Sequence, residues 1–329
     1  MDWQRLQDVL VVCVPVFMMI AVGKLLERRG ILNAEHRNFA NWLTYNLALP
    51  ALIFTAVAKQ RVSNLINIPL LAGPLIAIAL LTVLFIVLAR LFKLRGSLAA
   101  AFVFGTFWAN VSYMGFPLAR NAFGENGMRN AAIYNAFIMP TFVVLAFVLI
   151  GFYGGETKGG FADKIRRAFV NPIVLAAVAG IVVAFAGEIF RNEDGVFQAP
   201  ALLASGLEMT GSFLNLLGAM GLPLALLAVG GSMHLTEIRK RFGLLVLVLI
   251  GKLILLPLAT LLVIRLFFPA TDPVTLAVAV TLSATPNAVA SFVVSRQIGV
   301  EEGFVSSMLV ISTALSVLSL PVWLYLVFY

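Results

Sequence analysis

Residues 104–117 read FGTFWANVSYMGFP, and residues 281–292 read TLSATPNAVASF. Each stretch lies inside a long apolar segment, one in each half of the chain. Each also places proline, asparagine and small polar residues where a lipid-spanning helix is ordinarily continuous and apolar. We therefore expect the helix to be interrupted in both places.

An interrupted helix frees backbone N–H and C=O groups that lipid cannot satisfy. Such an interruption is tolerated only where protein buries it or where it lines a watery cavity. Two interrupted segments at corresponding positions in the two halves of a chain are typical of the substrate site of a transporter. The two stretches therefore predict a binding site near mid-membrane.

The composition places the chain in a membrane. Of its 329 residues, 61% are hydrophobic and only 12% are charged, whereas a soluble domain carries about 25% charged residues. The net charge of +8 does not indicate a nucleic-acid partner, because the positive side chains fall in short loops that orient a membrane protein. We expect the lipid bilayer, and no nucleic acid, as the macromolecular environment.

Ten apolar segments are long enough to cross a bilayer, which takes about 20 residues. The connections between them are short, and none can hold a soluble domain. The glycine-containing residues 154–171 form the expected cytoplasmic linker between two halves. The predicted spans, numbered 1 to 10, are residues 9–26, 40–58, 70–91, 98–119, 130–153, 172–190, 210–230, 243–267, 275–296 and 304–327.

Lys and Arg residues set the predicted orientation. With the N-terminus outside, the cytoplasmic loops carry roughly twice as many Lys and Arg residues as the external ones. We therefore expect both the N-terminus and the C-terminus outside.

Five spans on each side of the linker predict an inverted-topology repeat, because the second half must then enter the membrane from the opposite side. Residues 1–153 form the first predicted five-helix repeat and residues 172–329 the second. Short sequence echoes support the repeat: residues 49–54 with 222–227, residues 89–92 with 264–267, and Phe116 and Arg120 with Phe292 and Arg296.

If the two interrupted segments cross, two half-helix N-termini point at one locus. Their partial positive charge and unpaired N–H groups favour an anion, and a carboxylate in particular. The alternative is a pair of kinked helices whose Ser, Thr and Gly residues serve only helix packing. The candidate substrate-binding residues in the two stretches are Asn110, Ser112, Gly115, Pro117, Thr285, Pro286, Asn287 and Ser291.

Lys252 is the ionisable residue that lies clearly inside a predicted span. A charge at that depth costs at least about 2.5 kcal/mol and indicates function by default. Lys252 is therefore a further candidate for substrate binding, or a replacement for a coupling cation. The alternative is that its ammonium group snorkels to the cytoplasmic interface.

The predicted spans contain no paired carboxylates, no histidine cluster and no metal-ligand spacing. We therefore expect neither an enzyme nor a bound metal or cofactor. A carboxylate-based proton relay is not supported, while sodium could bind at the carbonyl groups of an unwound helix. The coupling ion, Na⁺ or H⁺, is left open, as is uniport driven by the membrane potential.

The chain resembles the auxin efflux carrier family, and its bacterial branch in particular. The short linker also favours that branch, since plant members often have a long loop there. The resemblance covers essentially the whole chain and rests on residues 23–32, 46–54, 110–118, 222–230 and 285–288.

The resemblance implies an all-α protein with ten spans in two inverted repeats and broken crossover helices 4 and 9. Spans 1, 2, 6 and 7 would form a scaffold and homodimer surface, and spans 3–5 and 8–10 a mobile transport domain. It also implies small organic anion substrates, the bacterial inner membrane, and a carboxylate flanked by Asn110, Pro117, Pro286 and Asn287. The two-proline crossover is not symmetric here, because Pro117 aligns with Val293 and Pro286 with Asn110.

The sequence thus predicts a secondary transporter that moves a small organic anion by elevator-like alternating access. An anion channel would use the same half-helix dipoles without a moving domain. A sodium-coupled carrier of the bile-acid-symporter type is the other alternative.

Overall fold

The computed structural model describes residues 3–58, 67–153, 166, 170–190, 201–232 and 239–328. In these residues the chain is helical throughout, with no strand and one isolated β-bridge. Six of the described helices are long and apolar enough to cross a membrane: Ala34–Ala58, Ile68–Leu91, Val111–Tyr153, Ala204–Ser232, Phe242–Phe267 and Glu302–Val327. The fold is that of a polytopic helical membrane protein, as predicted.

The helices follow the predicted spans closely, although several spans are built from more than one element. In the first half these are α1 (Trp3–Arg28), α2 (Ala34–Leu43), η1 (Thr44–Ala48), α3 (Leu49–Ala58), α5 (Ile68–Leu91), α6 (Gly96–Phe104), η2 (Val111–Gly115) and α7 (Phe116–Tyr153). In the second half they are α9 (Pro172–Glu188), α10 (Ala201–Ala219), α11 (Gly221–Ser232), α13 (Phe242–Ile250), η3 (Gly251–Leu255), α14 (Leu256–Phe267), α15 (Pro273–Ala284), α16 (Val289–Ile298) and α17 (Glu302–Phe328).

The predicted boundary between spans 4 and 5 is a kink rather than an extended loop. Helix α7 runs through it, with non-helical backbone at Gly124 (φ 64°, ψ −153°). Glycine adopts this positive φ without the steric clash that a side chain would cause. The predicted linker, residues 154–171, lies outside the described residues except for Arg166, Val170 and Asn171.

Three π-helical turns, η1, η2 and η3, share one local cause. Each ends two residues before a proline, namely Pro50, Pro117 and Pro257. Proline has no N–H to donate, and its ring clashes with the carbonyl group four residues earlier, so the preceding helix must change its hydrogen-bonding pattern. Such π turns are frequent at functional sites, and all three of these lie close to the site described below.

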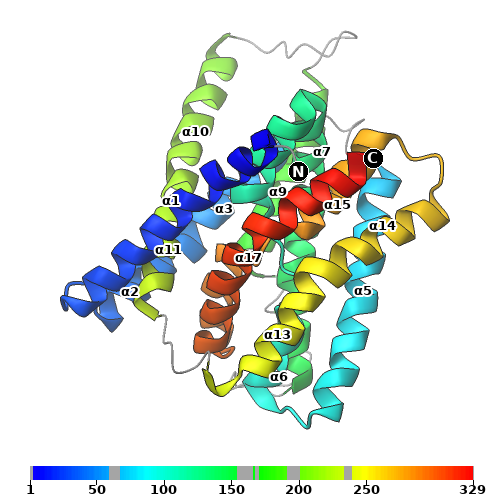
Figure 1. Ribbon diagram of the computed structural model, residues 1–329. Coiled ribbons are helices and arrows are strands. Elements are labelled where there is room, and N and C mark those ends of the chain that lie inside the picture. The colour runs from blue at the N-terminus through cyan, green and yellow to red at the C-terminus, as the bar shows by residue number, and fades with distance from the viewer. Residues whose placement is uncertain are drawn as a thin grey trace.

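Two groups of helices lie on either side of a central set that includes α7, α9, α15 and α17 (Figure 1). Helices α1, α2, α10 and α11 lie on the left of the view, while α5, α6, α13 and α14 lie on the right. Within the first group α1 packs closely on α11, because a Cβ atom at Gly230 would collide with the carbonyl group of Ile20. Small residues that allow such close backbone approach are typical of membrane helix interfaces.

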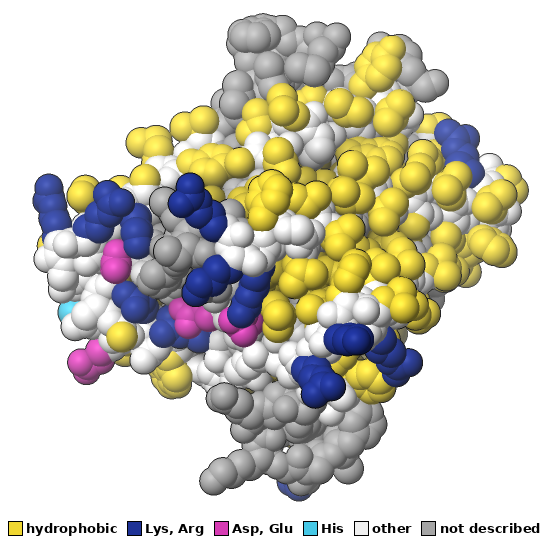
Figure 2. Space-filling model, turned by 60° about the horizontal axis from the view of Figure 1, so that its bottom comes forward, with side chains coloured by type: hydrophobic (Ala, Val, Ile, Leu, Met, Phe, Trp, Pro, Cys, Tyr) yellow, Lys and Arg dark blue, Asp and Glu magenta, His cyan; other side chains and the backbone are white. Residues whose placement is uncertain are grey.

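The outer surface is largely apolar, as a lipid-facing surface must be. Figure 2 shows a broad area of hydrophobic side chains, with most of the Lys, Arg, Asp and Glu side chains gathered towards one side of the view. A soluble monomer rarely exposes a contiguous apolar area of more than a few hundred Å². Exposed large side chains include Leu80, Val83, Leu91, Phe185, Ile189, Phe213, Leu216, Leu266 and Phe267.

Candidate functional site

The two interrupted stretches meet and pair with each other. Helix α6 ends at Phe104 and η2 begins at Val111, while α15 ends at Ala284 and α16 begins at Val289. Between these ends Ala109 and Asn287 form an antiparallel bridge. The expected crossing of the two interrupted stretches is therefore present.

Backbone hydrogen bonds hold the crossing together. The N–H of Asn110 donates to the carbonyl of Pro286 at 2.9 Å, and the N–H of Ala288 donates to the carbonyl of Trp108 at 3.1 Å. Each break thus provides hydrogen-bond partners for backbone groups of the other, and lipid could not provide such partners. The crossing is buried, with every residue from Gly105 to Val111 and from Ala284 to Phe292 in the protein interior.

A pocket opens directly beside this crossing. It is a small, partly open hollow with room for about one water molecule in this conformation. One wall is apolar and comes from α3 and α7, and the other contains the first residues of η2 and α16. The lining residues are Leu49, Leu52, Ile53, Ala109, Asn110, Val111, Ser112, Tyr113, Asn135, Met139, Ala288 and Ala290.

The polar groups that line the pocket are rich in donors. The Ser112 hydroxyl donates to Asn135 Oδ1 at 3.1 Å, which fixes the orientation of the amide and leaves its Nδ2 group buried without an acceptor. The Tyr113 hydroxyl is also buried without a partner. Among the described residues, no Asp or Glu lines the pocket. Such unpaired buried donors are costly unless a ligand satisfies them.

The two half-helices add backbone donors to the same pocket. The N–H groups of the first residues of a helix have no acceptor within that helix, and the first residues that line the pocket are Val111 and Ser112 in η2 and Ala290 in α16. Helix N-termini also carry a partial positive charge. The arrangement is chemically suited to an anion with several acceptor oxygens.

Sequence reasoning missed Asn135 and Tyr113. Asn135 is 1% exposed and lies in α7, within predicted span 5, where an amide is easily interpreted as a packing residue. Its hydrogen bond to Ser112, 23 residues away, is what brings it to the pocket. The available signal for this residue was an amide inside a span, although predicted span 5 contains a second one, Asn130.

The predicted site residues divide into three groups. Asn110 and Ser112 line the pocket. Gly115, Thr285, Pro286, Asn287 and Ser291 are buried at the crossing but lie outside the pocket lining, and they support the two breaks. Pro117 is exposed near the start of α7 and does not line the pocket. Its local effect is the π turn η2, which carries Ser112 and Tyr113.

Lys252 is fully buried, at 0% exposure, so the snorkelling interpretation is wrong. Its Nζ atom donates to the backbone carbonyl of Ser283 at 2.6 Å. Ser283 lies in the last turn of α15, where the helix is interrupted. Lys252 therefore belongs to the crossing but does not line the pocket.

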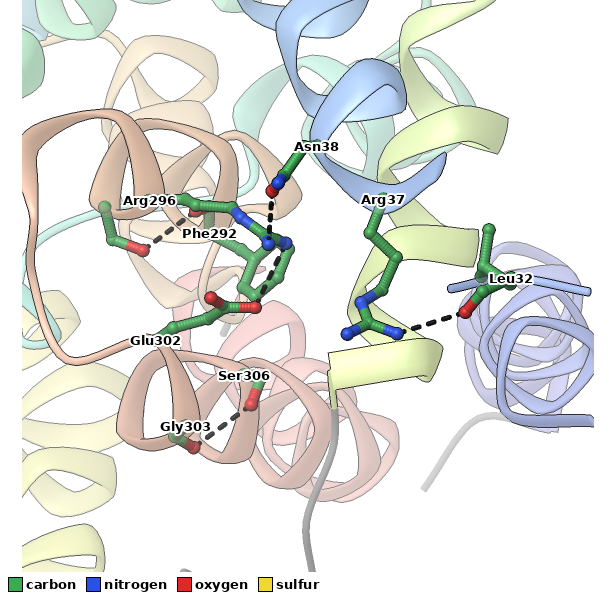
Figure 3. A network of polar contacts seen from close by, with 9 residues as sticks. Leu32, Arg37, Asn38, Phe292, Arg296, Glu302, Gly303 and Ser306 are labelled. Atoms are coloured by element: carbon green, nitrogen blue, oxygen red, sulfur yellow. Dashed lines mark hydrogen bonds and ion pairs between the residues drawn. The ribbon is translucent and has the colours of Figure 1, made fainter. Parts of the chain in front are cut away.

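A separate polar network joins α16 to the first group of helices (Figure 3). Arg296, at the end of α16, donates to Asn38 Oδ1 of α2 at 2.6 Å and forms an ion pair with Glu302 of α17 at 3.2 Å. Arg37 of α2 donates to the carbonyl of Leu32 nearby. These contacts link the helix that follows the second break to α2.

Comparison with known proteins gives a consistent assignment. The family model described as "Membrane transport protein" matches residues 8–155 and 162–324. The chain is 27% identical over 320 residues to a protein of Rhizobium meliloti named "Putative malonate transporter", covering 95% of this chain and 94% of that protein. It is 25% identical over 313 residues to an uncharacterized transporter of Methanothermobacter thermautotrophicus, covering 94% and 95% of the two chains.

A third relative, an uncharacterized transporter of Methanocaldococcus jannaschii, is 30% identical over 122 residues, covering 35% of this chain and 39% of that protein. The family and its named relatives are transporters and not enzymes. Together with the apolar helices, they identify a multi-pass membrane protein with a small-molecule substrate. The chain belongs to the membrane transport protein family, the family of the auxin efflux carriers.

Proposed function

We propose that this protein is a secondary transporter for a small organic anion with at least one carboxylate group. The observation that carries the proposal is the donor-rich pocket at the crossing. The amide of Asn135 and the hydroxyl of Tyr113 lack acceptors there, and two half-helices begin at its wall. A carboxylate offers two oxygens that accept several such hydrogen bonds.

The opposite wall of the pocket favours an organic anion over a fully hydrated inorganic one. Leu49, Leu52 and Ile53 of α3 and Met139 of α7 contribute apolar surface. In this proposal the pocket widens to admit its substrate, and a short carbon chain then lies against this wall while its carboxylate faces the half-helix N-termini. The name of the Rhizobium meliloti relative makes malonate the first probe.

Transport in this proposal proceeds by alternating access with an elevator-like movement. Ten spans form two inverted five-helix repeats, with α6–η2 and α15–α16 as the broken crossover helices. The scaffold of spans 1, 2, 6 and 7 forms a homodimer, and spans 3–5 and 8–10 move. What supports this division is the position of the pocket between α3, a proposed scaffold helix, and the crossing.

The proposed location is the bacterial inner membrane, with both termini outside. In this orientation Arg296 and Asn38 lie on the cytoplasmic side. Their hydrogen bond joins a proposed moving helix to a proposed scaffold helix, and it would have to break during each transport cycle. Cysteine labelling at Gly187, near the external end of α9, and at Lys240, near the cytoplasmic end of α13, tests the orientation.

The experiment is thermal stabilisation of the purified protein by malonate, acetate and chloride, with labelled malonate uptake into proteoliposomes. We compare wild type with Asn135→Leu, which removes the unpaired amide, and with Asn130→Leu as a matched control. Asn130 lies on the same helix, but its Nδ2 group donates to Thr275 at 3.1 Å and it does not line the pocket.

We expect malonate to stabilise wild type and Asn130→Leu, and Asn135→Leu to bind malonate about 10- to 100-fold more weakly, since a hydrogen bond to a charged group contributes about 1.5–3 kcal/mol. No stabilisation by any carboxylate would refute the substrate class. Chloride currents without saturable exchange of labelled malonate would favour the channel instead.

A further inference from the structure

Lys252 is the one charged residue among the buried side chains of the described residues. It has three N–H donors, and the contact that fixes its position is the 2.6 Å hydrogen bond to the Ser283 carbonyl. Among the described residues no carboxylate is buried beside it, and the partner of its ammonium group is a neutral carbonyl. Because burying a charged group costs several kcal/mol of free energy, such a residue indicates a specific function.

The environment of Lys252 is the C-terminal end of a half-helix. The last carbonyl groups of a helix have no partner within it and carry a partial negative charge. In α15 these groups end inside the protein. The carbonyl of Leu282 accepts from the Thr285 hydroxyl at 2.7 Å, and that of Ser283 accepts from Lys252. In transporters with broken helices, such ends coordinate the coupling cation.

Other oxygen atoms gather around the same residue. The Ser283 hydroxyl lies 3.1 Å from the Thr260 hydroxyl and 3.4 Å from the Tyr134 hydroxyl. All three side chains are buried. Together with the Ser283 carbonyl they form a cluster of neutral oxygens, the kind of ligand that an alkali cation takes from proteins, and the lysine ammonium donates into this cluster.

The equivalent position on the first break carries no charge. There the carbonyl of Gly105, just after α6, accepts from the neutral amide of Asn287 at 2.7 Å. The positive charge is therefore specific to the end of α15. The π turn η3, which precedes Pro257, contains Lys252 and sets the direction of its side chain.

We propose that the Lys252 ammonium group takes the place of a metal cation at the end of α15, so that this protein needs no sodium to bind or transport its anion. Lys252 is a positioning residue in this view. It stabilises the interrupted helix whose other side begins at Val289 beside the pocket, and it does not contact the substrate. The claim about sodium-independent transport rests on the proposed function, whereas the claim that the ammonium group replaces a cation does not.

The first test needs no substrate. The variant Lys252→Ala removes the ammonium group and leaves the oxygen cluster with space beside it. We expect 150 mM NaCl, compared with 150 mM choline chloride, to raise the melting temperature of Lys252→Ala by about 3 °C or more. Wild type and the control Lys240→Ala, an exposed lysine, should melt at the same temperature in both salts.

Two results would overturn the proposal. One is a sodium-dependent rise of similar size in wild type, and the other is a folded Lys252→Ala protein that does not respond to sodium. If Lys252→Ala folds only when purified in NaCl, the proposal is supported, and if it folds in neither salt, the cation-site interpretation fails.

The second test uses malonate uptake. Wild type and Lys252→Arg should transport equally well in sodium and in choline, whereas Lys252→Ala should lose at least 10-fold in choline and recover in sodium. If wild type transports no carboxylate but the melting temperatures respond to sodium as expected, the proposed substrate is wrong and the proposed role of the Lys252 ammonium group as a cation substitute is supported. If wild type transports malonate only with sodium, the proposed substrate is supported and the proposal that Lys252 replaces the cation is wrong.

Discussion

The two interrupted helices of this protein are stabilised in different ways. The first, residues 105–110, is bounded by aromatic side chains, and the second, residues 285–288, contains Pro286 and is held mainly by hydrogen bonds. Both begin alike, because Thr106 and Thr285 each donate a hydroxyl to the carbonyl three residues earlier at 2.7 Å. After that first step the two segments diverge.

The first break is stabilised chiefly by packing. The Trp108 ring lies 4.9 Å from that of Phe104 and 5.7 Å from that of Phe142, while Phe107 contacts both of these phenylalanines. The second break uses Ser312 of α17, which accepts from the N–H of Asn287 at 3.0 Å, and Lys252. Pseudo-symmetric geometry thus does not require equivalent chemistry: beyond the backbone hydrogen bonds that the two breaks share, the first is held chiefly by aromatic packing and the second chiefly by polar side chains.

The largest effect expected from this comparison is at Trp108. Trp108→Ala should lower the free energy of unfolding by about 3–5 kcal/mol, because a large ring is removed from a packed interior. Trp42, which is 53% exposed against 0% for Trp108, provides the control Trp42→Ala, with a loss below about 0.5 kcal/mol. Unfolding in detergent micelles measures both, and equal losses would contradict the packing account of the first break.

The next effect is at Asn287, which links the two breaks. Asn287→Ala removes the donor to the Gly105 carbonyl and leaves a buried acceptor unpaired, at a cost of about 1–3 kcal/mol. Asn46→Ala is the control, because the Asn46 amide donates to the carbonyl of Trp42 at an exposed site. Thermal unfolding of the two variants measures the difference. An Asn287→Ala variant as stable as wild type would mean that the hydrogen bond of the Asn287 side chain contributes nothing to the crossing.

A smaller effect is expected at Ser312. Ser312→Ala leaves the N–H of Asn287 without its acceptor and should lower stability by about 1 kcal/mol, within the range found for hydrogen bonds between membrane helices. Ser306→Ala on the same helix is the matched control, because that hydroxyl only donates to the carbonyl of Gly303 within its own helix. Hydrogen exchange at Asn287 should accelerate in Ser312→Ala alone.

The smallest effect concerns the two arginines that the repeat aligns. Arg120 forms an exposed ion pair with Glu125 at 2.9 Å, and such pairs contribute only about 0.2–1 kcal/mol, whereas Arg296 reaches α2. A double-mutant cycle on Arg296 and Asn38 should therefore give a larger coupling energy than one on Arg120 and Glu125. Equal coupling would mean that the contact between α16 and α2 is incidental.

The sequence predicted the interruptions because they are local. Gly105, Pro286 and Asn287 disfavour a continuous helix by their own chemistry, and the apolar segments around them have the length of a span. The same local rule accounts for Pro117, but sequence reasoning placed it beside the substrate. The structure shows instead that it follows the π turn η2 and is exposed.

The pocket could not be read in the same way, because its donors meet only through tertiary contacts. Asn135 reaches the pocket through Ser112, and the wall at Leu49 comes from a helix some 60 residues before the first crossing residue. The sequence showed that Lys252 was a costly charge. It gave no indication that the partner would be a backbone carbonyl, because every residue type carries one.

The pairing between the two breaks also has a consequence for synthesis. The N–H of Asn110 and the carbonyl of Trp108 find their partners at Pro286 and Ala288, which a ribosome adding 5–20 residues per second reaches roughly 10–35 s later. Until then the first half holds polar backbone groups that the bilayer cannot satisfy. We therefore expect the first half to depend on the second for stable insertion, and the two halves to mature as a single unit in the membrane.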